Sequence, residues 1–314
     1  MKSYAFGVDL GGTSVKLGLF LSDGALVEKW EIPTRTKNHS ENLLPDIAQT
    51  LLGKLEEKSI PVEDVAGIGI GVPGAVLRGS YVMPCVNLDQ WGGEVARQLS
   101  DLCKLPVRVV NDANAAALGE MSNGGGKGCK NLVLVTLGTG VGGGIIVDGK
   151  LVAGVHGAGG EIGHMKVAEP DDDICGCGKS GCLERYSSAT GVVNRAKRLL
   201  ADETVSSAMR QYTPLTCKDV IDCAKAGDAA ALQIVDTMTR MLGKALSIVC
   251  CVCDPEVVVI GGGVARAGQI LTDGIRRHFE EYAFPSTTET KFVLAELGND
   301  AGIYGAVQMI LGNH

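Results

Sequence analysis

Short apolar runs alternate with glycine-rich turns along this chain, and two of these patterns occur twice. Residues 4–20 contain an apolar run, a glycine–threonine turn and a second apolar run, and residues 131–147 repeat this order. Each repeat predicts a β-hairpin followed by a short polar turn, at 22–24 and at 148–150. In a second pair, residues 67–74 and 257–264, an apolar run leads into glycines. The chain therefore predicts two similar α/β halves whose glycine turns line one cleft.

Apolar residues spaced three or four apart predict helices between these runs. Residues 41–58 place Leu44, Ile47, Leu51, Leu52 and Leu55 on one face, and residues 93–104 do the same with Val95, Leu99 and Leu102. Further helices are predicted at 113–121, 228–252, 265–283 and 299–311. The helix at 228–252 is expected to begin after Asp228 and to stop at Asp254-Pro255. The glycine run at 124–126 marks the region, 115–130, where the domain boundary is expected.

Composition and charge narrow the class of protein. The chain has 314 residues, of which 45% are apolar, which is enough for two domain cores. The formal net charge of −7 disfavours binding to nucleic acid or to an anionic membrane surface. No apolar run is long enough to span a bilayer, and the first residues lack the pattern of a signal peptide. We therefore expect a cytoplasmic protein, in which the eleven cysteines are reduced and those outside 175–182 are buried.

One short segment concentrates metal-binding side chains. It holds a histidine and three cysteines within nineteen residues, namely His164, Cys175, Cys177 and Cys182. These residues provide the nitrogen and sulfur ligands of a closed, tetrahedral, structural zinc site, and the alternatives are free thiols or a redox pair. Glu161 precedes the histidine by three residues and Glu184 follows the last cysteine by two. A bound metal would hold both carboxylates near the imidazole, where they suit a polyhydroxylated ligand.

The tip of the first predicted hairpin combines residues that suit a nucleotide phosphate. It contains Asp9, Gly11, Gly12, Thr13 and Lys16. Backbone N–H groups of consecutive glycines bind phosphate oxygens, while the threonine adds a hydroxyl and the lysine a cation. The aspartate can hold the hydration shell of Mg²⁺. The alternative is a plain hairpin turn without a ligand.

The other glycine segments are less specific. Residues 138–143 match the dinucleotide pattern G-x-G-x-x-G, but an apolar strand follows them where that pattern requires a helix, so a dinucleotide site is rejected. We expect Gly138, Thr139 and Gly140 to contact the outer phosphates of a nucleotide instead. Residues Gly261, Gly262 and Gly263 lie between a β-branched run and a predicted helix. Close approach of a purine and a crowded strand–helix turn explain these three glycines equally well.

Asn111 and Asp112 follow the predicted strand 107–110 and open the helix at 113–121. Strand ends in α/β sheets commonly present catalytic groups. An aspartate at the start of a helix is also a common capping residue. These two residues alone leave both interpretations open.

Taken together, these motifs resemble the ROK family of sugar kinases, within the superfamily of actin, hexokinase and Hsp70. The resemblance covers essentially the whole chain and rests on D-x-G-G-T-x-x-K at 9–16, L-G-T-G-V-G at 137–142, I-G-G-G at 260–263 and E-x-G-H at 161–164 with the three cysteines. Residues 110–120 and 181–191 are most similar to the bacterial glucokinases of this family.

The resemblance implies an α/β, actin-like (ribonuclease H-like) duplicated fold of two domains with a cleft between them. The smaller N-terminal domain would comprise residues 1–118, completed by the C-terminal helix at 299–314. The larger domain would comprise residues 119–298, with the zinc loop and a surface for homodimerisation.

The same resemblance implies an ATP-dependent glucokinase that phosphorylates the 6-hydroxyl of glucose, with Mg²⁺ and structural Zn²⁺. It makes Asp112 the general base and assigns sugar binding to Gly74, Asn111, Asp112, Glu161, His164 and Glu184. It places ATP against Asp9, Gly11, Gly12, Thr13, Lys16, Gly138, Thr139, Gly140, Gly261, Gly262 and Gly263. His164 would use one ring nitrogen for zinc and the other for the sugar.

Two alternatives accompany this prediction. The first is a ROK kinase for another hexose, such as N-acetylmannosamine, N-acetylglucosamine, fructose or allose, since these kinases share the same cage residues; polyphosphate could also replace ATP as donor. The second is a sugar-responsive repressor of the same family. Such repressors carry a DNA-binding domain before the kinase-like core, whereas here the first hairpin begins within ten residues and the chain is acidic. The repressor is therefore disfavoured.

Overall fold

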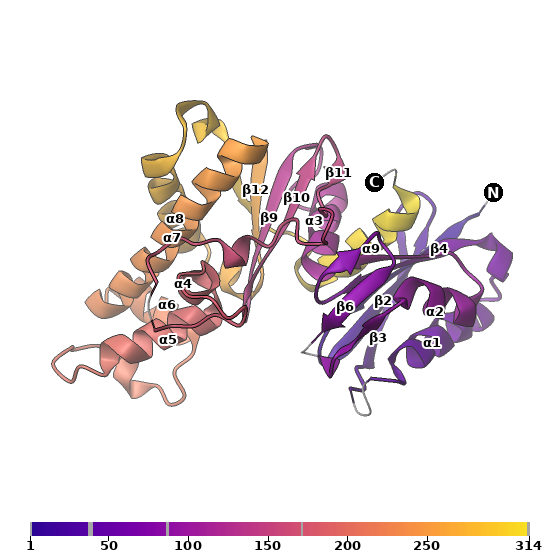
Figure 1. Cartoon of the computed structure of the whole chain (residues 1–314), viewed down its shortest axis with the longest axis horizontal. Helices are drawn as coiled ribbons and strands as arrows, with labels where there is room; N and C mark the ends of the chain where they lie inside the picture. Colours follow the sequence, from indigo (N-terminus) through magenta and orange to yellow (C-terminus); the bar gives the residue numbers. More distant parts are fainter. Residues whose placement is uncertain (1, 37–39, 86–87, 171, 313–314) are drawn as a thin grey trace. The chain divides into compact units, whose positions relative to one another are not determined.

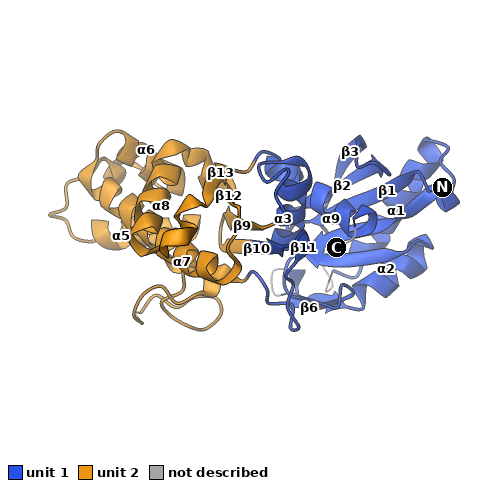
Figure 2. Cartoon of the chain, turned by 90° about the horizontal axis from the view of Figure 1, so that it is seen from above, with its two compact units in different colours: residues 1–130, 144–160, 296–314 blue, residues 131–143, 161–295 orange. Residues whose placement is uncertain are grey.

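The computed structural model describes residues 2–36, 40–85, 88–170 and 172–312 (Figure 1). The chain divides into two compact units, coloured separately in Figure 2. Unit 1 comprises residues 1–130, 144–160 and 296–314, and unit 2 comprises residues 131–143 and 161–295. The unit limits thus fall at other residues than the predicted domain limits of 118 and 299, and those domain limits stay a prediction. Among the described residues, none of the helices is both long and apolar enough to cross a bilayer.

The sheet of unit 1 begins with the predicted hairpin. Its strands are β1 (Tyr4–Leu10), β2 (Ser14–Leu21), β3 (Leu26–Pro33), β4 (Val65–Val72) and β8 (Val107–Asn111), in the order β3-β2-β1-β4-β8. The first three strands are antiparallel, while β1, β4 and β8 run parallel. The register pairs Asp9 with Gly71 and Val72 with Asn111. The carboxyl ends of three parallel strands therefore share one edge of this sheet.

Successive side chains of β1 point to opposite faces and fill two cores. Phe6 and Val8 join a large cluster with α1 (Leu43–Glu57) and α2 (Val95–Cys103). Ala5 joins a smaller cluster with Ile303 of α9 (Ala301–Leu311), which packs against α3 (Asp112–Asn123). The helices predicted at 41–58, 93–104, 113–121 and 299–311 are confirmed. The expected burial of Leu102 is wrong, since 44% of this residue is exposed at the rim of a pocket.

A small sheet in unit 1 has no counterpart in the predictions. It consists of β5 (Val76–Leu77), β6 (Tyr81–Cys85) and β7 (Trp91–Gly93), in the order β5-β6-β7. Strands of two to five residues are too short to show an alternating pattern, which explains why the sequence did not reveal them.

The second sheet repeats the strand order of the first. Its strands are β9 (Leu132–Leu137), β10 (Val141–Val147), β11 (Lys150–Leu151), β12 (Val257–Gly261) and β13 (Lys291–Leu294), in the order β11-β10-β9-β12-β13. In both sheets an antiparallel hairpin is followed by two parallel strands. This repetition confirms the predicted duplicated α/β fold.

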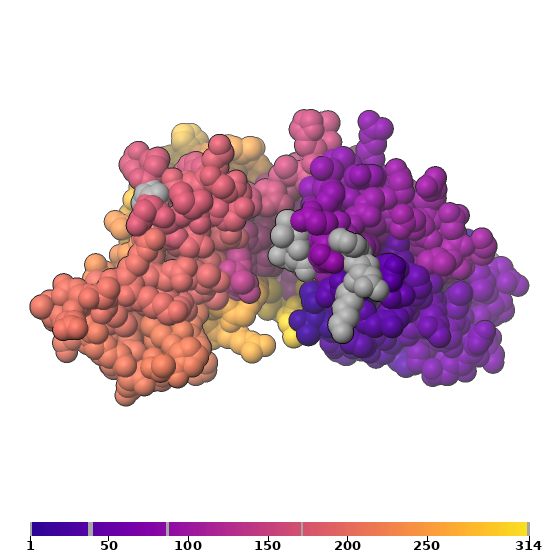
Figure 3. All heavy atoms as spheres, turned by 60° about the horizontal axis from the view of Figure 1, so that its bottom comes forward, coloured from indigo at the N-terminus to yellow at the C-terminus, as the bar shows by residue number. Residues whose placement is uncertain are grey.

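The helices of unit 2 are α4 (Glu184–Ser187), α5 (Ala189–Leu200), α6 (Cys217–Lys225), α7 (Ala229–Cys253) and α8 (Gln269–Tyr282). Helix α7 begins after the N-cap Asp228 and ends before Pro255, as predicted. The helix predicted at 265–283 is interrupted, because Gly268 has a φ of +70° and separates a 3₁₀ segment from α8. Helices α5 and α6 were not predicted. The segment that follows α5, residues 201–204, is exposed. The part of the chain around it, salmon in the colour bar, forms surface on the left of Figure 3.

Short 3₁₀ segments complete the described chain, at Val62–Asp64, Ile162–His164, Ala208–Gln211, Gly263–Ala267, Pro285–Glu289 and Gly298–Asp300. All eleven cysteines are free thiols, as expected. The expected burial outside 175–182 is wrong at Cys251, which is exposed. This residue lies on the outer face of α7 with Ile248 and Val252, which are also exposed.

Candidate functional site

The start of α3 holds the predicted general base, and the neighbouring asparagine does the capping. Asn111 is the N-cap residue, and its Oδ1 accepts the N–H groups of Ala113 (3.0 Å) and Asn114 (3.1 Å). Its Nδ2 donates to Oδ1 of Asp112 (2.9 Å) and to the carbonyl oxygen of Gly74 (3.1 Å). Oδ1 of Asp112 also accepts the N–H of Ala113 (2.8 Å). Asn111 is therefore the N-cap residue, and Asp112 is held both by Asn111 and by a backbone N–H of the first helical turn. Both donor hydrogens of the Asn111 amide are engaged within the protein.

Asp9 lies one residue before the end of β1, at the same edge of the unit 1 sheet. Burial raises the pKa of this carboxyl to about 6, with the charge of Asp112 adding to the shift and the ammonium of Lys16 opposing it. A Cβ placed on Gly302 would lie 2.4 Å from Cγ of Asp9, so a glycine is required there for α9 to begin against the carboxyl. Two carboxyl groups, of which Asp112 raises the pKa of Asp9, lie beside one lysine and form a site suited to a cation.

The hairpin tip of unit 1 is closed by a residue that sequence reasoning missed. Thr34 donates its N–H to the carbonyl of Thr13 (2.9 Å) and its hydroxyl to the carbonyl of Gly11 (2.7 Å). The N–H of Gly11 donates to the carbonyl of Ser14 (3.0 Å). A Cβ on Gly12 would meet no atom within 4 Å. The open space at this tip therefore lies at Gly12, while the N–H of Gly11 is already used by the turn.

In unit 2 the predicted metal ligands come together. The ligand atoms of His164, Cys175, Cys177 and Cys182 all lie within 4.8 Å of one another. Sγ of Cys175 is 3.5 Å from Nδ1 of His164, and Sγ of Cys177 is 3.6 Å from Sγ of Cys182. A tetrahedral zinc site with Zn–S bonds of about 2.3 Å has ligand–ligand edges of roughly 3.8 Å. The donor set and its spacing therefore fit a tetrahedral metal ion.

A lysine supports this cluster from outside the ligand set. Nζ of Lys166 donates to Sγ of Cys182 and to the carbonyl oxygen of Ser180, both at 2.8 Å. A nearby ammonium favours the thiolate, which is the form that binds metals. Burial raises the pKa of the Cys175 thiol to about 12. The charge of a bound metal would therefore be needed to hold Cys175 as a thiolate.

His164 can serve two partners because its ring nitrogens face different groups. Nδ1 faces the sulfur of Cys175, whereas Nε2 lies 3.9 Å from Oε2 of Glu161. The side chains of His164 and Glu161 are 40% and 44% exposed, so a ligand can reach both. This geometry is compatible with a metal at Nδ1 and a hydroxyl at Nε2.

Glu184 connects the metal cluster to the glycine hairpin of unit 2, a link that the sequence did not predict. Its Oε2 accepts the N–H of Val141 (3.0 Å), and its Oε1 lies 3.5 Å from Sγ of Cys175. A Cβ on Gly140 would lie 2.3 Å from Oε2. The absence of a side chain at Gly140 therefore lets the carboxylate approach the hairpin backbone.

The remaining glycines separate into crowded and open positions. Gly262 has a φ of +84°, and a Cβ there would lie 2.4 Å from the carbonyl oxygen of Leu137, so the crowded-turn interpretation holds at this residue. A Cβ on Gly263 or on Gly138 would meet no atom within 4 Å. A Cβ on Gly261 would lie 3.2 Å from Cβ of Ala295. Space for a ligand is thus available at Gly263 and Gly138.

The predicted residues fall into two groups. Unit 1 holds Asp9, Gly11, Gly12, Thr13, Lys16, Gly74, Asn111 and Asp112. Unit 2 holds Gly138, Thr139, Gly140, Glu161, His164, Cys175, Cys177, Cys182, Glu184 and Gly261 to Gly263.

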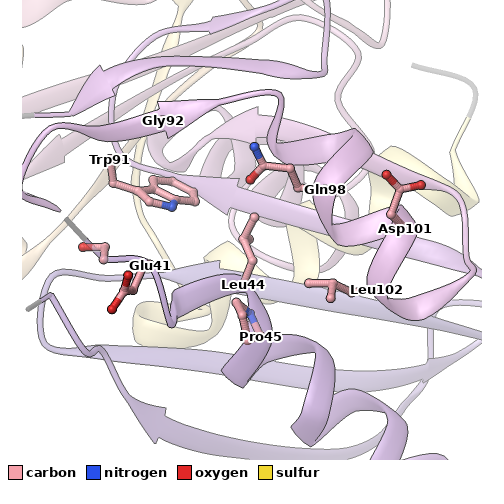
Figure 4. A pocket seen from close by; sticks show the side chains of 9 residues that line it. Glu41, Leu44, Pro45, Trp91, Gly92, Gln98, Asp101 and Leu102 are labelled. Atoms are coloured by element: carbon pink, nitrogen blue, oxygen red, sulfur yellow. The ribbon is translucent and has the colours of Figure 1, made fainter. Parts of the chain in front are cut away.

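Unit 1 also contains a pocket of about 540 Å³, and its lining residues are not among the predicted site residues. It is lined by α1 and α2 residues and by Trp91, with carboxyl groups of Glu41 and Asp101 and the amide of Gln98 around it (Figure 4). None of its lining residues belongs to a predicted motif. We assign it no part in the candidate site.

Comparison with known proteins identifies close relatives over the full chain. Residues 5–313 match the ROK family. The chain is 42% identical to a glucokinase of Halalkalibacterium halodurans, covering 95% of this chain and 92% of the relative, and 36% identical to a glucokinase of Thermotoga maritima, covering 97% and 96%. A crystal structure of a ROK family glucokinase from Streptomyces griseus in complex with glucose and AMPPNP has a TM-score of 0.77 and 31% identity, covering 98% of this chain and 99% of that one.

Proposed function

The chain belongs to the ROK family, and on this premise we propose that it is an ATP-dependent glucokinase with the actin-like two-domain fold. It transfers the terminal phosphoryl group of ATP to the 6-hydroxyl of glucose, giving glucose 6-phosphate and ADP. The observation that carries the proposal is the 42% identity to a glucokinase over 95% of the chain. The oriented Asp112 and the gathered His164 cluster supply the groups that this reaction requires.

In unit 1 we assign the acid–base and charge-neutralising roles. Asp112 accepts the proton of the 6-hydroxyl, and Asn111 holds it in place by the 2.9 Å hydrogen bond. Asp9 is placed to hold the hydration shell of Mg²⁺, which supplies charge neutralisation on the triphosphate when it is bound. Lys16 and the backbone near Gly12 and Thr13 are assigned to phosphate oxygens. Phosphoryl transfer depends mainly on such alignment and charge neutralisation.

In unit 2 we assign recognition of the sugar and part of the nucleotide. Glu161, Nε2 of His164 and Glu184 are assigned to sugar hydroxyls, while Gly138, Thr139 and Gly263 are assigned to ATP. We infer that the metal is Zn²⁺, held by His164 and the three cysteines. Because all four ligands come from the protein, the metal would order the loop and would not activate water. Gly74 and Asn111 of unit 1 stay predicted sugar contacts.

A sugar-panel kinase assay tests the proposed function. The purified chain is given MgATP and one sugar at a time, with glucose, N-acetylmannosamine, N-acetylglucosamine, fructose and allose at equal concentrations, and ADP release is followed. We expect the highest kcat/KM with glucose. A higher kcat/KM with another hexose would replace the assigned substrate, and polyphosphate in place of ATP in the same assay tests the donor.

Metal analysis tests the zinc assignment independently of activity. We expect elemental analysis of the purified chain to give one zinc per chain, and the Cys177→Ser variant to give much less. Zinc bound with equal stoichiometry by the variant would contradict the assignment of the four ligands.

We also infer a cytoplasmic homodimer. A reaction that consumes ATP and a chain with eleven free thiols suit a reducing compartment. Unit 2 exposes the apolar side chains of Val252 (84%) and Phe284 (61%), and such residues are typical of contact surfaces when they cluster. Sedimentation velocity is expected to give twice the mass of the chain, and a monomer at micromolar concentration would contradict the inference.

A further inference from the structure

The chain crosses between the two units four times, after residues 130, 143, 160 and 295. At the last crossing the backbone hydrogen bonds change partner from one residue to the next. The N–H of Ala295 donates to the carbonyl of Ile260 in unit 2 (2.9 Å), whereas the N–H of Glu296 donates to Oε2 of Glu120 in unit 1 (3.1 Å). The rotatable backbone bonds between these two anchored N–H groups are the φ and ψ bonds of Ala295.

At the first crossing, a single peptide group carries one anchor in each unit. The carbonyl of Lys130 accepts the N–H of Gly149 in unit 1 (2.8 Å). The N–H of the next residue, Asn131, donates to Oε1 of Glu256 in unit 2 (2.9 Å). The carbonyl of Lys130 and the N–H of Asn131 belong to one planar peptide group, so no rotatable bond lies between the two anchors of this crossing. At the last crossing, backbone rotation between the anchors is confined to φ and ψ of Ala295.

Glu120 is the anchor on the unit 1 side, and it is fully buried. Its carboxylate accepts three backbone N–H groups, from Gly125 (2.8 Å), Glu296 (3.1 Å) and Leu297 (2.9 Å). Burying a carboxylate costs folding free energy unless its oxygens accept hydrogen bonds. Here the donors to Glu120 come from two segments that are far apart in the sequence. These two segments are the ones that lead into the first crossing and out of the last.

The same helix carries the proposed base. Helix α3 begins at Asp112 and contains Glu120, so both are fixed on one rigid element. A Cβ on Gly305 would lie 1.5 Å from the carbonyl oxygen of Ala115, which shows how closely α9 packs against α3. A Cβ on Gly144, the first residue after the second crossing, would lie 2.6 Å from Cβ of Ala117. Helix α3 therefore contacts the chain near three of the four crossings.

We propose that Glu120 is a positioning residue that couples closure of the two units to the placement of Asp112, with Glu256 as its counterpart anchor in unit 2. This inference rests on the proposed kinase function, because closure matters for excluding water from phosphoryl transfer. Glu120 touches neither substrate nor reacting atoms. Its effect passes through the two segments that it holds and through α3.

The main experiment compares wild type with Glu120→Gln in the full chain. The amide has the same shape but replaces one acceptor oxygen with a donor, so at least one of the bonds to Gly125, Glu296 and Leu297 is lost. We expect kcat for the best sugar to fall about 10- to 100-fold, the range expected for a lost hydrogen bond to a charged group. Glucose affinity measured without ATP should change less than about threefold, since the group does not contact the sugar.

Two further readouts separate positioning from general destabilisation. The ratio of ATP hydrolysis to sugar phosphorylation should rise in Glu120→Gln, and the compaction on adding glucose and AMPPNP, measured by small-angle X-ray scattering, should shrink. A residue with only a structural role would lower the melting temperature or the active fraction without changing this ratio. An unchanged ratio and unchanged compaction would overturn the proposal.

Ser122→Ala is the matched control. Ser122 lies at the same end of α3, and its hydroxyl donates to the carbonyl of Gly119 (3.0 Å), which is within the helix. We expect wild-type kcat and hydrolysis ratio from this variant, and an effect equal to that of Glu120→Gln would overturn the proposal. If Glu120→Gln does not fold, Glu256→Gln tests the counterpart anchor, whose bond to Asn131 is exposed. It should raise the hydrolysis ratio in the same direction, and an unchanged ratio would count against the proposal.

Hydrogen exchange distinguishes failure of this inference from failure of the proposed function. The amides of Gly125, Glu296 and Leu297 should exchange faster in Glu120→Gln than in wild type, whatever sugar the enzyme prefers. Equal exchange rates in both proteins would contradict the proposed anchoring role of Glu120. Faster exchange in a protein without glucokinase activity would support the anchoring role of Glu120 and contradict only the assignment of glucose as substrate.

Discussion

The two glycine hairpins occupy corresponding places in their sheets, but they carry different side chains. Asp9 in β1 faces Gly71 of β4, and Thr136 in β9 faces Gly261 of β12 at the corresponding position of the second sheet. Across the first hairpin Asp9 is paired with Lys16, so the strands themselves carry two charges. The strands of the second hairpin carry no charged residue at these positions. Duplication has therefore reproduced the geometry while leaving the charges in one copy.

The second hairpin obtains its carboxylate from elsewhere. Glu184 belongs to α4, next to the metal loop, and docks on the hairpin through the N–H of Val141. In unit 1 the position of Asp9 is fixed by strand register, whereas in unit 2 Glu184 follows the cysteine loop, which the proposed metal would order. Under the proposed function, unit 1 supplies the general base and the carboxyl group for Mg²⁺, and unit 2 supplies Glu161, His164 and Glu184 for the sugar.

The largest expected effect is on the base in unit 1. We predict that Asp112→Asn lowers kcat by about 10²- to 10⁴-fold, because general-base assistance is typically of this size. Folding should be retained, since the amide keeps an acceptor for Nδ2 of Asn111. Steady-state kinetics with glucose check the prediction, and Glu184→Gln is the comparison in unit 2, where we expect mainly a higher KM for glucose. An Asp112→Asn variant with kcat within threefold of wild type would remove the base assignment and the contrast between the units.

The next effect concerns the metal loop of unit 2. We predict that Lys166→Met weakens metal binding by about 10- to 100-fold, as is typical when a group that supports metal ligands is lost. The lysine donates to Sγ of Cys182, and its charge favours the thiolate. Competition with a chelator measures the affinity. Lys179→Met, in the same loop with an exposed side chain, should leave it unchanged, and equal loss in both variants would point to loop charge in general.

A smaller effect is expected where Glu184 meets the hairpin. We predict that Gly140→Ala raises the KM for glucose by about 3- to 10-fold, because its Cβ would lie 2.3 Å from Oε2 of Glu184 and would displace the carboxylate from Val141. Gly138→Ala should leave the glucose KM unchanged, since a Cβ there meets no atom within 4 Å. Equal glucose KM values for both variants would show that docking on the hairpin does not orient Glu184.

The smallest expected effect is on stability, through Asp9. Its pKa, raised to about 6 by burial, means that the folded protein binds a proton there more tightly than the unfolded chain. The ionised carboxyl thus lowers stability above pH 6, and this loss disappears as pH falls through 6 toward the ordinary aspartate pKa near 4. We predict that Asp9→Asn melts a few degrees higher than wild type at pH 8 and at the same temperature near pH 4.

The enzymatic activity that depends on Asp9 should change with pH in the opposite direction to the stability. In wild type, kcat/KM for MgATP should fall about tenfold per pH unit below pH 6, because a protonated Asp9 no longer holds the hydration shell of Mg²⁺. The kcat/KM of Asp9→Asn for MgATP should be low at every pH and should not show this decrease below pH 6. Differential scanning fluorimetry and kinetics from pH 5 to 8 check both parts. A wild-type profile that is flat down to pH 5 would separate Asp9 from the metal.

The sequence alone determined the elements whose signals are local. The repeated hairpins, the helix faces and the stop of α7 before Pro255 follow from side-chain periodicity and from backbone restrictions, which act over a few residues. The metal cluster was also predictable, because all four ligands lie between His164 and Cys182, so a short loop brings them together. The position of Asp112 at the edge of the sheet followed from its place directly after a strand.

Only the tertiary structure decided the hydrogen-bond partners of the carboxylates of Glu120 and Glu184. Glu120 receives N–H groups from Glu296 and Leu297, and Glu184 receives that of Val141. Each of these bonds joins residues that are more than forty positions apart. Periodicity reports which face of a helix is apolar, but it contains no information on which distant backbone N–H will meet a given oxygen. Which N–H donates to which oxygen depends on how the two folded segments pack, and this packing depends on side chains throughout the core.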